Sequence, residues 1–179
     1  MTTAARLYGQ SLYDLAAQEG LTEEILYEME TVDAILKENP DYVALLLEPS
    51  VKKKERLGLV EEAFRDQIHP YLMNFLMILI EKSLLRGFHA CCRTFREAYN
   101  KDNGIAEATV TSAVALTQAQ ADALRTRLEE MSGKAVHLRQ KVDSGVLAGL
   151  KVEMEGKLLD GTVMGRLRDL RKKVSETVL

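Results

Sequence analysis

The sequence predicts an α+β protein: an N-terminal bundle of six helices (residues 1–104) followed by a small C-terminal α/β domain (residues 105–179). Three observations predict this organisation. Apolar residues recur at helical spacing before Gly104 and alternate with a period of two after it. Residues 1–104 carry 12 Lys and Arg against 17 Asp and Glu, whereas residues 105–179 carry 12 against 10. Only 6% of the residues are aromatic and Trp is absent, which favours helical cores built from aliphatic side chains.

Apolar stripes and cap residues predict the first three helices. Residues 4–18 carry the first stripe, and Gly20 ends it. Thr22 begins the second helix, whose first turn holds two glutamates at the positive end of the helix dipole. Asn39 is predicted to cap a short third helix, with Pro40 in its first turn. The predicted inward residues of the first two helices are Ala5, Tyr8, Leu12, Leu15 and Ala16, then Ile25, Met29, Val32 and Leu36.

Three further helices complete the predicted bundle. One lies within residues 50–64, the next begins at Pro70, and the last ends near Asn103 and Gly104. Short loops between them favour a compact bundle. Their predicted apolar faces are, in order, Leu57, Val60 and Phe64; Leu72, Phe75, Leu76, Leu79 and Ile80; and Phe88, Cys92, Phe95 and Tyr99.

The C-terminal part reads as strand, helix, strand, strand, short strand and helix. Residues 105–113 and 135–142 alternate as half-buried strands do. Thr117 and Gln120 form a predicted capping box at the start of the helix between them, whose stripe is Leu124, Leu128 and Met131. The second strand is predicted to point Val136, Leu138, Gln140 and Val142 inward.

Residues 142–170 hold five of the eleven glycines, and these fall at predicted turns. A strand predicted over residues 146–154 turns at Gly156, which we expect to accept a positive φ, and returns through residues 157–160. Gly161 and Thr162 then begin a last helix with a basic outer face. Its predicted apolar stripe is Val163, Leu167, Leu170 and Val174.

No residue pattern requires catalysis, and no cofactor is expected. The phosphate-loop patterns GxGxxG and GxxxxGK[ST] are absent, although the helix start at Gly161 with Arg166 nearby leaves anion binding as an alternative. His69, His89 and His137 fall in three separate elements, with His69 in a cap region and His137 on a polar strand face. Asp143 and Asp160 sit at turns, where Asp commonly binds backbone N–H groups. The run Lys52–Lys54 reads as a solvated helix start.

The cysteine usage and hydropathy predict a protein of a reducing compartment. Cys91 and Cys92 are adjacent, so they fit neither a disulfide framework nor CxxC metal spacing and are expected to be buried thiols. The N-terminal residues lack the apolar core of a secretory signal. The most apolar stretch, residues 71–80, is well short of the roughly 20 residues that span a membrane.

The glycine-rich stretch resembles the C-terminal signature of the delta subunit of F-type ATP synthases, the oligomycin-sensitivity-conferring protein family. Val142, Asp143, Leu147 and Gly149 match its beginning, and Lys157, Asp160, Gly161, Val163, Gly165 and Leu167 match the rest, while Ala148 stands for a Gly and Thr162 for a Ser. The stretches "AARLYGQSLYDLA", "NFLMILIEKSLL" and "VTSAVALTQAQ" are similar to three further family segments in the same order.

The resemblance implies a non-catalytic stator subunit. Family members bind the N-terminal segment of a catalytic-head alpha subunit through the helical domain, in a groove of the first and fifth helices. Their C-terminal domain binds the end of peripheral-stalk subunit b. The protein is then present in a single copy in a hetero-oligomer, couples proton-driven rotation to ATP synthesis, and lies peripherally on the cytoplasmic side of a bacterial inner membrane.

The groove residues expected from this resemblance are apolar residues of the two helices: Tyr8, Leu12, Leu15, Phe75, Ile78 and Leu79. Each of them also fits the bundle core, and Ile78 is the most informative because it lies beside the core stripe. The acidic first fifty residues could steer a basic partner segment. The structural signature residues are Asp143, Gly149, Gly156, Asp160, Gly161 and Gly165. An unrelated helical adaptor that binds an amphipathic partner helix is the alternative hypothesis, although it leaves the C-terminal signature unexplained.

Overall fold

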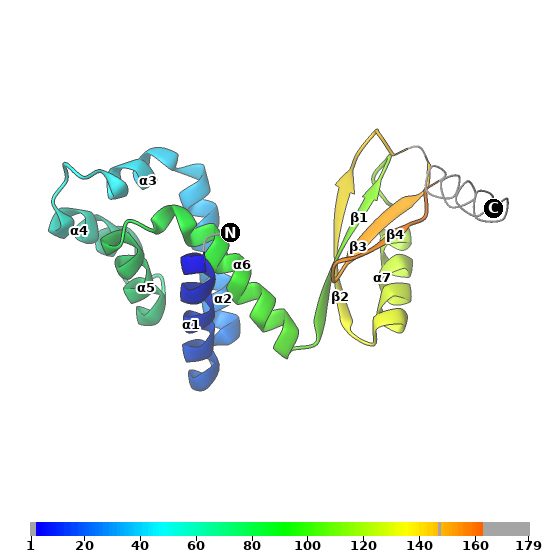
Figure 1. Ribbon diagram of the computed structural model, residues 1–179, viewed down its shortest axis with the longest axis horizontal. Coiled ribbons are helices and arrows are strands. Elements are labelled where there is room, and N and C mark those ends of the chain that lie inside the picture. The colour runs from blue at the N-terminus through cyan, green and yellow to red at the C-terminus, as the bar shows by residue number, and fades with distance from the viewer. Residues whose placement is uncertain (1–2, 147, 163–179) are drawn as a thin grey trace, which may run out of the picture. The chain divides into compact units, whose positions relative to one another are not determined.

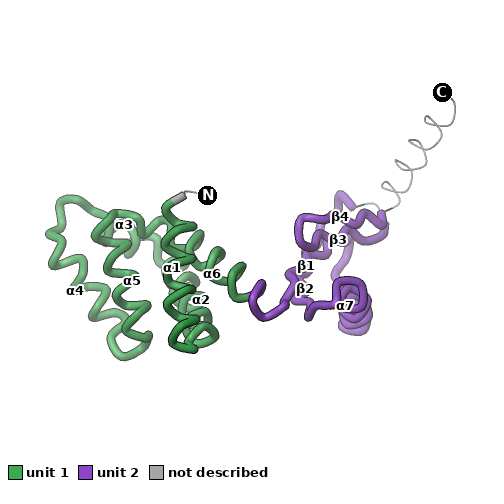
Figure 2. Tube along the Cα trace, turned by 60° about the horizontal axis from the view of Figure 1, so that its bottom comes forward, with its two compact units in different colours: residues 1–99 green, residues 100–179 purple. Residues whose placement is uncertain are grey.

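The computed structural model describes residues 3–146 and 148–162 (Figure 1). They contain seven α-helices, one short 3-10 helix and a four-stranded sheet, which confirms the α+β class. The chain divides into two compact units, Met1–Tyr99 and Asn100–Leu179 (Figure 2). The border predicted after Gly104 lies slightly beyond this division, which falls within the helix Phe88–Asp102.

Helices alone make up the first unit, which we call the helical unit. In chain order they are α1 (Thr3–Glu19), α2 (Thr22–Glu38), α3 (Pro40–Leu47), α4 (Lys53–Phe64), α5 (Pro70–Glu81), the 3-10 helix η1 (Leu85–Gly87) and α6 (Phe88–Asp102). Their boundaries agree with the predicted starts at Thr22, Pro40 and Pro70. Prolines fit at the first helical position because no N–H is required there.

A single apolar core joins the helices of this unit. The predicted stripe of α2 is entirely buried, from Ile25 to Leu36, and so are all five inward residues predicted for α5. Phe95 of α6 is fully buried and meets Tyr13 of α1 edge to face, with 5.2 Å between ring centroids. The predicted stripe of α1 omits Tyr13 and includes Leu15, which is 37% exposed.

The predicted cap at Asn39 is wrong. Its side-chain Nδ2 donates to the carbonyl of Ile35 at 2.8 Å, and its side chain makes no capping bond to α3. The Asn39 backbone N–H also donates to that carbonyl, so the residue satisfies the end of α2 instead. Pro40 and its fixed φ begin α3 without a side-chain cap.

The second unit, which we call the sheet unit, has the strand order β2-β1-β3-β4. Its elements are β1 (Ile105–Ser112), α7 (Gln118–Ser132), β2 (Ala135–Val142), β3 (Leu150–Met154) and β4 (Lys157–Asp160). β1 pairs with β2 in parallel and with β3 antiparallel, and β3 pairs antiparallel with β4. The parallel pair requires a crossover connection, which α7 supplies.

One face of this sheet packs against α7 (Figure 1). The buried residues of β1 alternate strictly, and Ala108 lies in register with Leu138 of β2 and Met154 of β3. Leu128 of α7 completes this second core. The predicted capping box of α7 is present, with Gln120 N–H donating to Thr117 Oγ1 and Thr117 N–H donating to Gln120 Oε1. Three predicted inward residues, however, are exposed: Met131, Gln140 and Val142.

The β3–β4 hairpin turns at Glu155 and Gly156, which both have positive φ, at 50° and 74°. This is the backbone conformation that a two-residue hairpin of right-handed twist requires. The predicted turn at Gly156 is therefore confirmed. The helix predicted from Val163 onward, with its basic face, lies outside the described residues.

Candidate functional site

The six predicted groove residues of the helical unit divide by burial. Leu12, Phe75 and Leu79 are buried in the core, at 4%, 6% and 1% exposure. Tyr8 is half-buried. Ile78 is 42% exposed and lies off the buried stripe of α5, as its position in the sequence predicted. Only Leu15 and Ile78 of the six thus present large exposed apolar surface.

A cavity of ≈ 440 Å³ opens between α1, the end of α5, η1 and α6. Tyr8 and Leu79 line it, so residues predicted from the first and fifth helices do meet at one place. The cavity also uses η1 and α6, which the sequence reasoning missed. Its other lining residues are Ala5, Ser83, Leu84, Arg86, Gly87, Ala90 and Cys91. We call this the α1–η1 cavity.

Small residues and a tight turn shape the α1–η1 cavity. Gly9 brings α1 close to α6, since a Cβ atom there would lie 2.7 Å from the carbonyl oxygen of Cys91. Ser83 ends α5 in the left-handed conformation, with φ 56°. The Leu84 N–H then donates back to the Leu79 carbonyl at 2.7 Å, which closes a Schellman-type turn and leads directly into η1.

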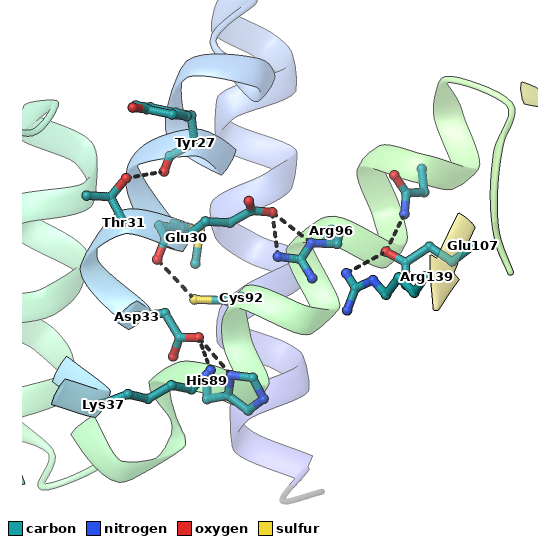
Figure 3. Close-up of polar contacts among 12 residues, drawn as sticks. Tyr27, Glu30, Thr31, Asp33, Lys37, His89, Cys92, Arg96, Glu107 and Arg139 are labelled. Carbon is teal, nitrogen blue, oxygen red and sulfur yellow. Dashed lines mark hydrogen bonds and ion pairs between the residues drawn. The ribbon is translucent and has the colours of Figure 1, made fainter. Parts of the chain in front are cut away.

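The two cysteines are free and buried, as predicted. Desolvation by burial raises the pKa of the Cys91 thiol to about 11, and it raises the pKa of Cys92 further still. Cys92 Sγ donates to the Met29 carbonyl at 3.6 Å (Figure 3). Both thiols therefore stay protonated at neutral pH, and nucleophilic chemistry by either one is disfavoured.

A second cleft, of ≈ 370 Å³, lies between α2, α3, η1 and α6. Asp33 supplies the carboxylate among the residues that line this cleft, and its side chain is only 13% exposed. Lys37 Nζ donates to Asp33 Oδ2 at 2.6 Å, and His89 Nδ1 lies 2.9 Å from the same oxygen (Figure 3). Arg86 lines this cleft as well as the α1–η1 cavity. Asp33 is thus already paired within the cleft.

Nothing in the described residues resembles a catalytic or metal-binding site. His69 caps α5, accepting from the Tyr71 N–H at 3.2 Å, and His137 is exposed on β2. His89 lies on α6, beside Asp33 of α2. Residues 3–146 and 148–162 hold no group of three or more His, Cys, Asp or Glu that could bind a metal ion. None of the helices among them is long and apolar enough to cross a membrane.

The signature residues of the sheet unit hold two loops together. Gly149 has φ 99°, and a Cβ atom on it would lie 2.5 Å from the Gly161 carbonyl oxygen. The Gly161 N–H donates to the Leu150 carbonyl at 2.9 Å. Asp160 Oδ1 accepts from both the N–H and the hydroxyl of Thr162, at 3.1 and 2.6 Å. A carboxylate of the chain itself therefore accepts from the Thr162 N–H, while the helix on which the anion-binding alternative depends lies outside the described residues.

Asp143 has the turn role predicted for it. Its Oδ1 accepts from the Gly145 N–H at 2.8 Å, and its backbone N–H donates to the Ser112 carbonyl of β1. Gly165, the last predicted signature residue, lies outside the described residues. In the helical unit, Lys53 of the basic run pairs with Glu81 at 2.9 Å across exposed surface.

Comparison with known proteins shows the family to which the chain belongs. The family model for the ATP synthase delta (OSCP) subunit matches residues 4–174. The ATP synthase subunit delta of Synechocystis is 32% identical over 92% of this chain and 89% of its own length. That of Clostridioides difficile is 29% identical over 97% of both chains.

A solved structure has the same fold at low sequence identity. A chain of the mitochondrial ATP synthase hexamer of Toxoplasma gondii aligns over 97% of this chain and 98% of its own, with a TM-score of 0.78 and 18% identity. The family match spans both units of the chain, so the alternative of an unrelated helical adaptor is not favoured. The chain therefore belongs to the ATP synthase delta (OSCP) subunit family, and it is a structural coupling subunit rather than an enzyme.

Proposed function

We propose that the helical unit binds the N-terminal segment of the ATP synthase alpha subunit, and that the sheet unit binds the C-terminal end of peripheral-stalk subunit b. The chain then ties the catalytic head to the stalk, so that proton-driven rotation produces ATP instead of turning the head. Each contact can be tested separately, because the two surfaces lie on different units.

The α1–η1 cavity is the observation that carries the head contact. It brings Tyr8 of α1 and Leu79 of α5 to one apolar opening of ≈ 440 Å³. An amphipathic helix binds a groove by inserting apolar side chains spaced three or four residues apart. Ile78, 42% exposed beside the buried Leu79, supplies further apolar surface of the kind such a helix covers.

Exposed apolar residues of the sheet unit support the stalk contact. Leu158 and Leu159 of β4 are 54% and 43% exposed, and Val142 at the end of β2 is 57% exposed. Isolated exposed apolar residues are common, but β4 is an edge strand and carries two in succession. Successive residues of a strand point to opposite faces, so β4 presents one apolar side chain on each face of this edge to a helix end of subunit b, while Val142 lies at the opposite edge.

The proposed location follows from these partners. A chain that binds both the head and the stalk is peripheral to the membrane and is held there through the complex. We place it on the cytoplasmic side of a bacterial inner membrane, in one copy per synthase.

Calorimetric titration tests the head contact. The full chain is titrated with a synthetic peptide of the N-terminal segment of the alpha subunit from the same organism. We expect one-to-one binding that Ile78→Asp weakens about tenfold or more, since a carboxylate cannot be buried against the apolar peptide face without a partner. Tyr27→Asp is the matched control, because Tyr27 is 73% exposed on α2 and lines none of the cavities described above. Absence of binding by the folded chain would disprove the head contact.

A further inference from the structure

The α1–η1 cavity carries one charged side chain, Arg86, and we propose that Arg86 recognises a carboxylate of the partner helix that inserts an apolar side chain into the cavity. This inference rests on the proposed head contact and adds a chemical requirement to it: the partner must carry an acidic residue near the apolar side chain that enters the cavity. Apolar complementarity alone imposes no such requirement.

Arg86 is exposed and has no partner within the part of the chain that the structure describes. It lies in η1, between the end of α5 and the start of α6. Among the described residues, no carboxylate or carbonyl accepts a hydrogen bond from its guanidinium, and no ion pair includes it. Most other arginines of the helical unit are paired: Arg65 with Glu61, Arg93 with Glu97 and Arg96 with Glu30.

The nearest candidate partner inside the molecule is already occupied. Within residues 3–146 and 148–162, Asp33 is the only carboxylate that lines either of the two openings that Arg86 borders. Its Oδ2 receives Lys37 at 2.6 Å and lies 2.9 Å from His89 Nδ1 (Figure 3). Two groups thus compete with Arg86 for one largely buried carboxylate. The guanidinium remains available to an external acceptor.

Apart from Arg86, the polar side-chain oxygens of the cavity lining are the hydroxyls of Tyr8 and Ser83, and the Ser83 side chain also has no hydrogen-bond partner in the described residues. Ser83 and Arg86 are three residues apart at the turn from α5 into η1. A partner carboxylate at this end can take N–H donors from the guanidinium fork and one O–H from the hydroxyl. Apolar side chains from the same partner face fill the space beside Tyr8 and Leu79.

Local charge favours an acidic group at this one point of an otherwise acidic unit. The first fifty residues hold ten acidic side chains and only two basic ones, so their general field favours a basic partner. Arg86 makes the electrostatic potential positive at this one place. A helix with basic residues on its outer face and one carboxylate beside its apolar anchor satisfies both features, and its register is then fixed by charge.

The test is a double-mutant cycle with the full chain and the same alpha-subunit peptide. Each Asp or Glu of the peptide is changed in turn to Asn or Gln, and each peptide is titrated into the native chain and into Arg86→Gln. We expect Arg86→Gln to weaken binding several-fold and Arg86→Glu about tenfold. One peptide position should lose its effect in the Arg86 variants, and a Lys at that position should restore binding to Arg86→Glu.

Lys82→Glu is the matched control, because it makes the same charge reversal four residues earlier in the chain. Lys82 is exposed and does not line the cavity. Lys82→Glu should weaken peptide binding much less than Arg86→Glu does, because Lys82 does not border the cavity. Peptide binding that is equal in the native chain, Arg86→Glu and Lys82→Glu would overturn this inference and leave the head contact intact. Absence of peptide binding to the native chain would overturn both, so the two failures are distinguishable.

Discussion

Among the described glycines of the sheet unit, Gly149 is the position that leaves the least room for a side chain. A Cβ atom there would lie 2.5 Å from the Gly161 carbonyl oxygen and 2.8 Å from Thr162 Cα, and both obstacles are backbone. Its φ of 99° is also costly for any residue with a side chain. We expect Gly149→Ala to lower the free energy of unfolding of the sheet unit by about 2–4 kcal/mol, as measured by chemical denaturation.

Gly156→Ala separates conformational strain from the steric clash. Gly156 also has a positive φ, 74°, but no atom lies within 4 Å of the place that a Cβ atom would take. We expect Gly156→Ala to lower the free energy of unfolding of the sheet unit by about 1 kcal/mol. Equal losses for the two variants would show that the contact between Gly149 and Gly161 is not tight in solution.

The buried thiols give a second prediction at this scale. Because burial raises the pKa of Cys91 to about 11, the native chain should react with iodoacetamide at pH 8 far more slowly than a small thiol does. In guanidinium chloride both cysteines should react fully. Mass spectrometry counts the added groups, and rapid modification of the folded chain would contradict the burial of Cys91 and Cys92.

Residue-level prediction from sequence succeeded where one interaction decides the outcome. The stripe from Ile25 to Leu36 and the Thr117–Gln120 capping box depend on local spacing, and both are present. Leu15 and Asn39 were misplaced because tertiary neighbours decide between similar local options. Arg86 was missed for the same reason: its importance comes from the cavity it borders, and residues from four elements form that cavity.

At the scale of elements, the contact between α1 and α6 depends on Gly9. A Cβ atom would lie 2.7 Å from the Cys91 carbonyl oxygen and 3.1 Å from Thr94 Cβ. Alanine has the higher helix propensity by about 1 kcal/mol, so the two effects oppose each other. We expect the clash to prevail and Gly9→Ala to lower the melting temperature of the helical unit, with a net loss of about 1–3 kcal/mol.

Gly58→Ala is the matched control for that variant. Gly58 lies inside α4, and no atom is within 4 Å of its Cβ position. Only helix propensity then acts, so we expect Gly58→Ala to raise the free energy of unfolding of the helical unit by up to about 1 kcal/mol. A stabilising Gly9→Ala, measured in the same thermal scan, would mean that α1 and α6 are farther apart than described.

The capping box of α7 allows a milder prediction. Thr117 Oγ1 accepts from the Gln120 N–H at 3.3 Å and so satisfies a donor of the first helical turn. Thr117→Ala should lower the stability of the sheet unit by about 1 kcal/mol, and Thr117→Ser should retain most of it. Denaturation monitored by circular dichroism compares the three chains. Equal stability of all three would exclude a stabilising role for this cap.

Elements were easier to predict than their faces. Stripe spacing, prolines and glycines were enough to predict the helices up to Asp102, and period-two alternation was enough to predict β1 and β2. The strand predicted from residue 146 begins only at Leu150, and β4 was predicted as the return of the hairpin at Gly156. Alternation alone could not tell how far α7 extends over the sheet. Gln140 and Val142 are therefore exposed, although they share the covered face with the buried Val136. The strand order β2-β1-β3-β4 likewise depends on contacts that spacing does not encode.

For the whole molecule, the two cores differ in kind. The helical unit buries aromatic side chains such as Phe88 and Phe95, whereas no fully buried core residue described in the sheet unit is larger than Leu128. Less apolar area per residue gives less stability. We expect faster amide hydrogen exchange in the sheet unit than in the helical unit when the chain is alone. Mass spectrometry of peptic fragments measures both, and equal protection would contradict this expectation.

Burial of both cysteines makes the chain a convenient host for fluorescent reporters. Because neither native thiol is accessible, Tyr27→Cys and Val114→Cys, each at a position 73% exposed, would create the two sites that maleimide dyes label. One dye then marks each unit without removal of either native cysteine. Energy transfer between the dyes could follow how a torque-bearing linkage stretches or bends while the enzyme complex turns over.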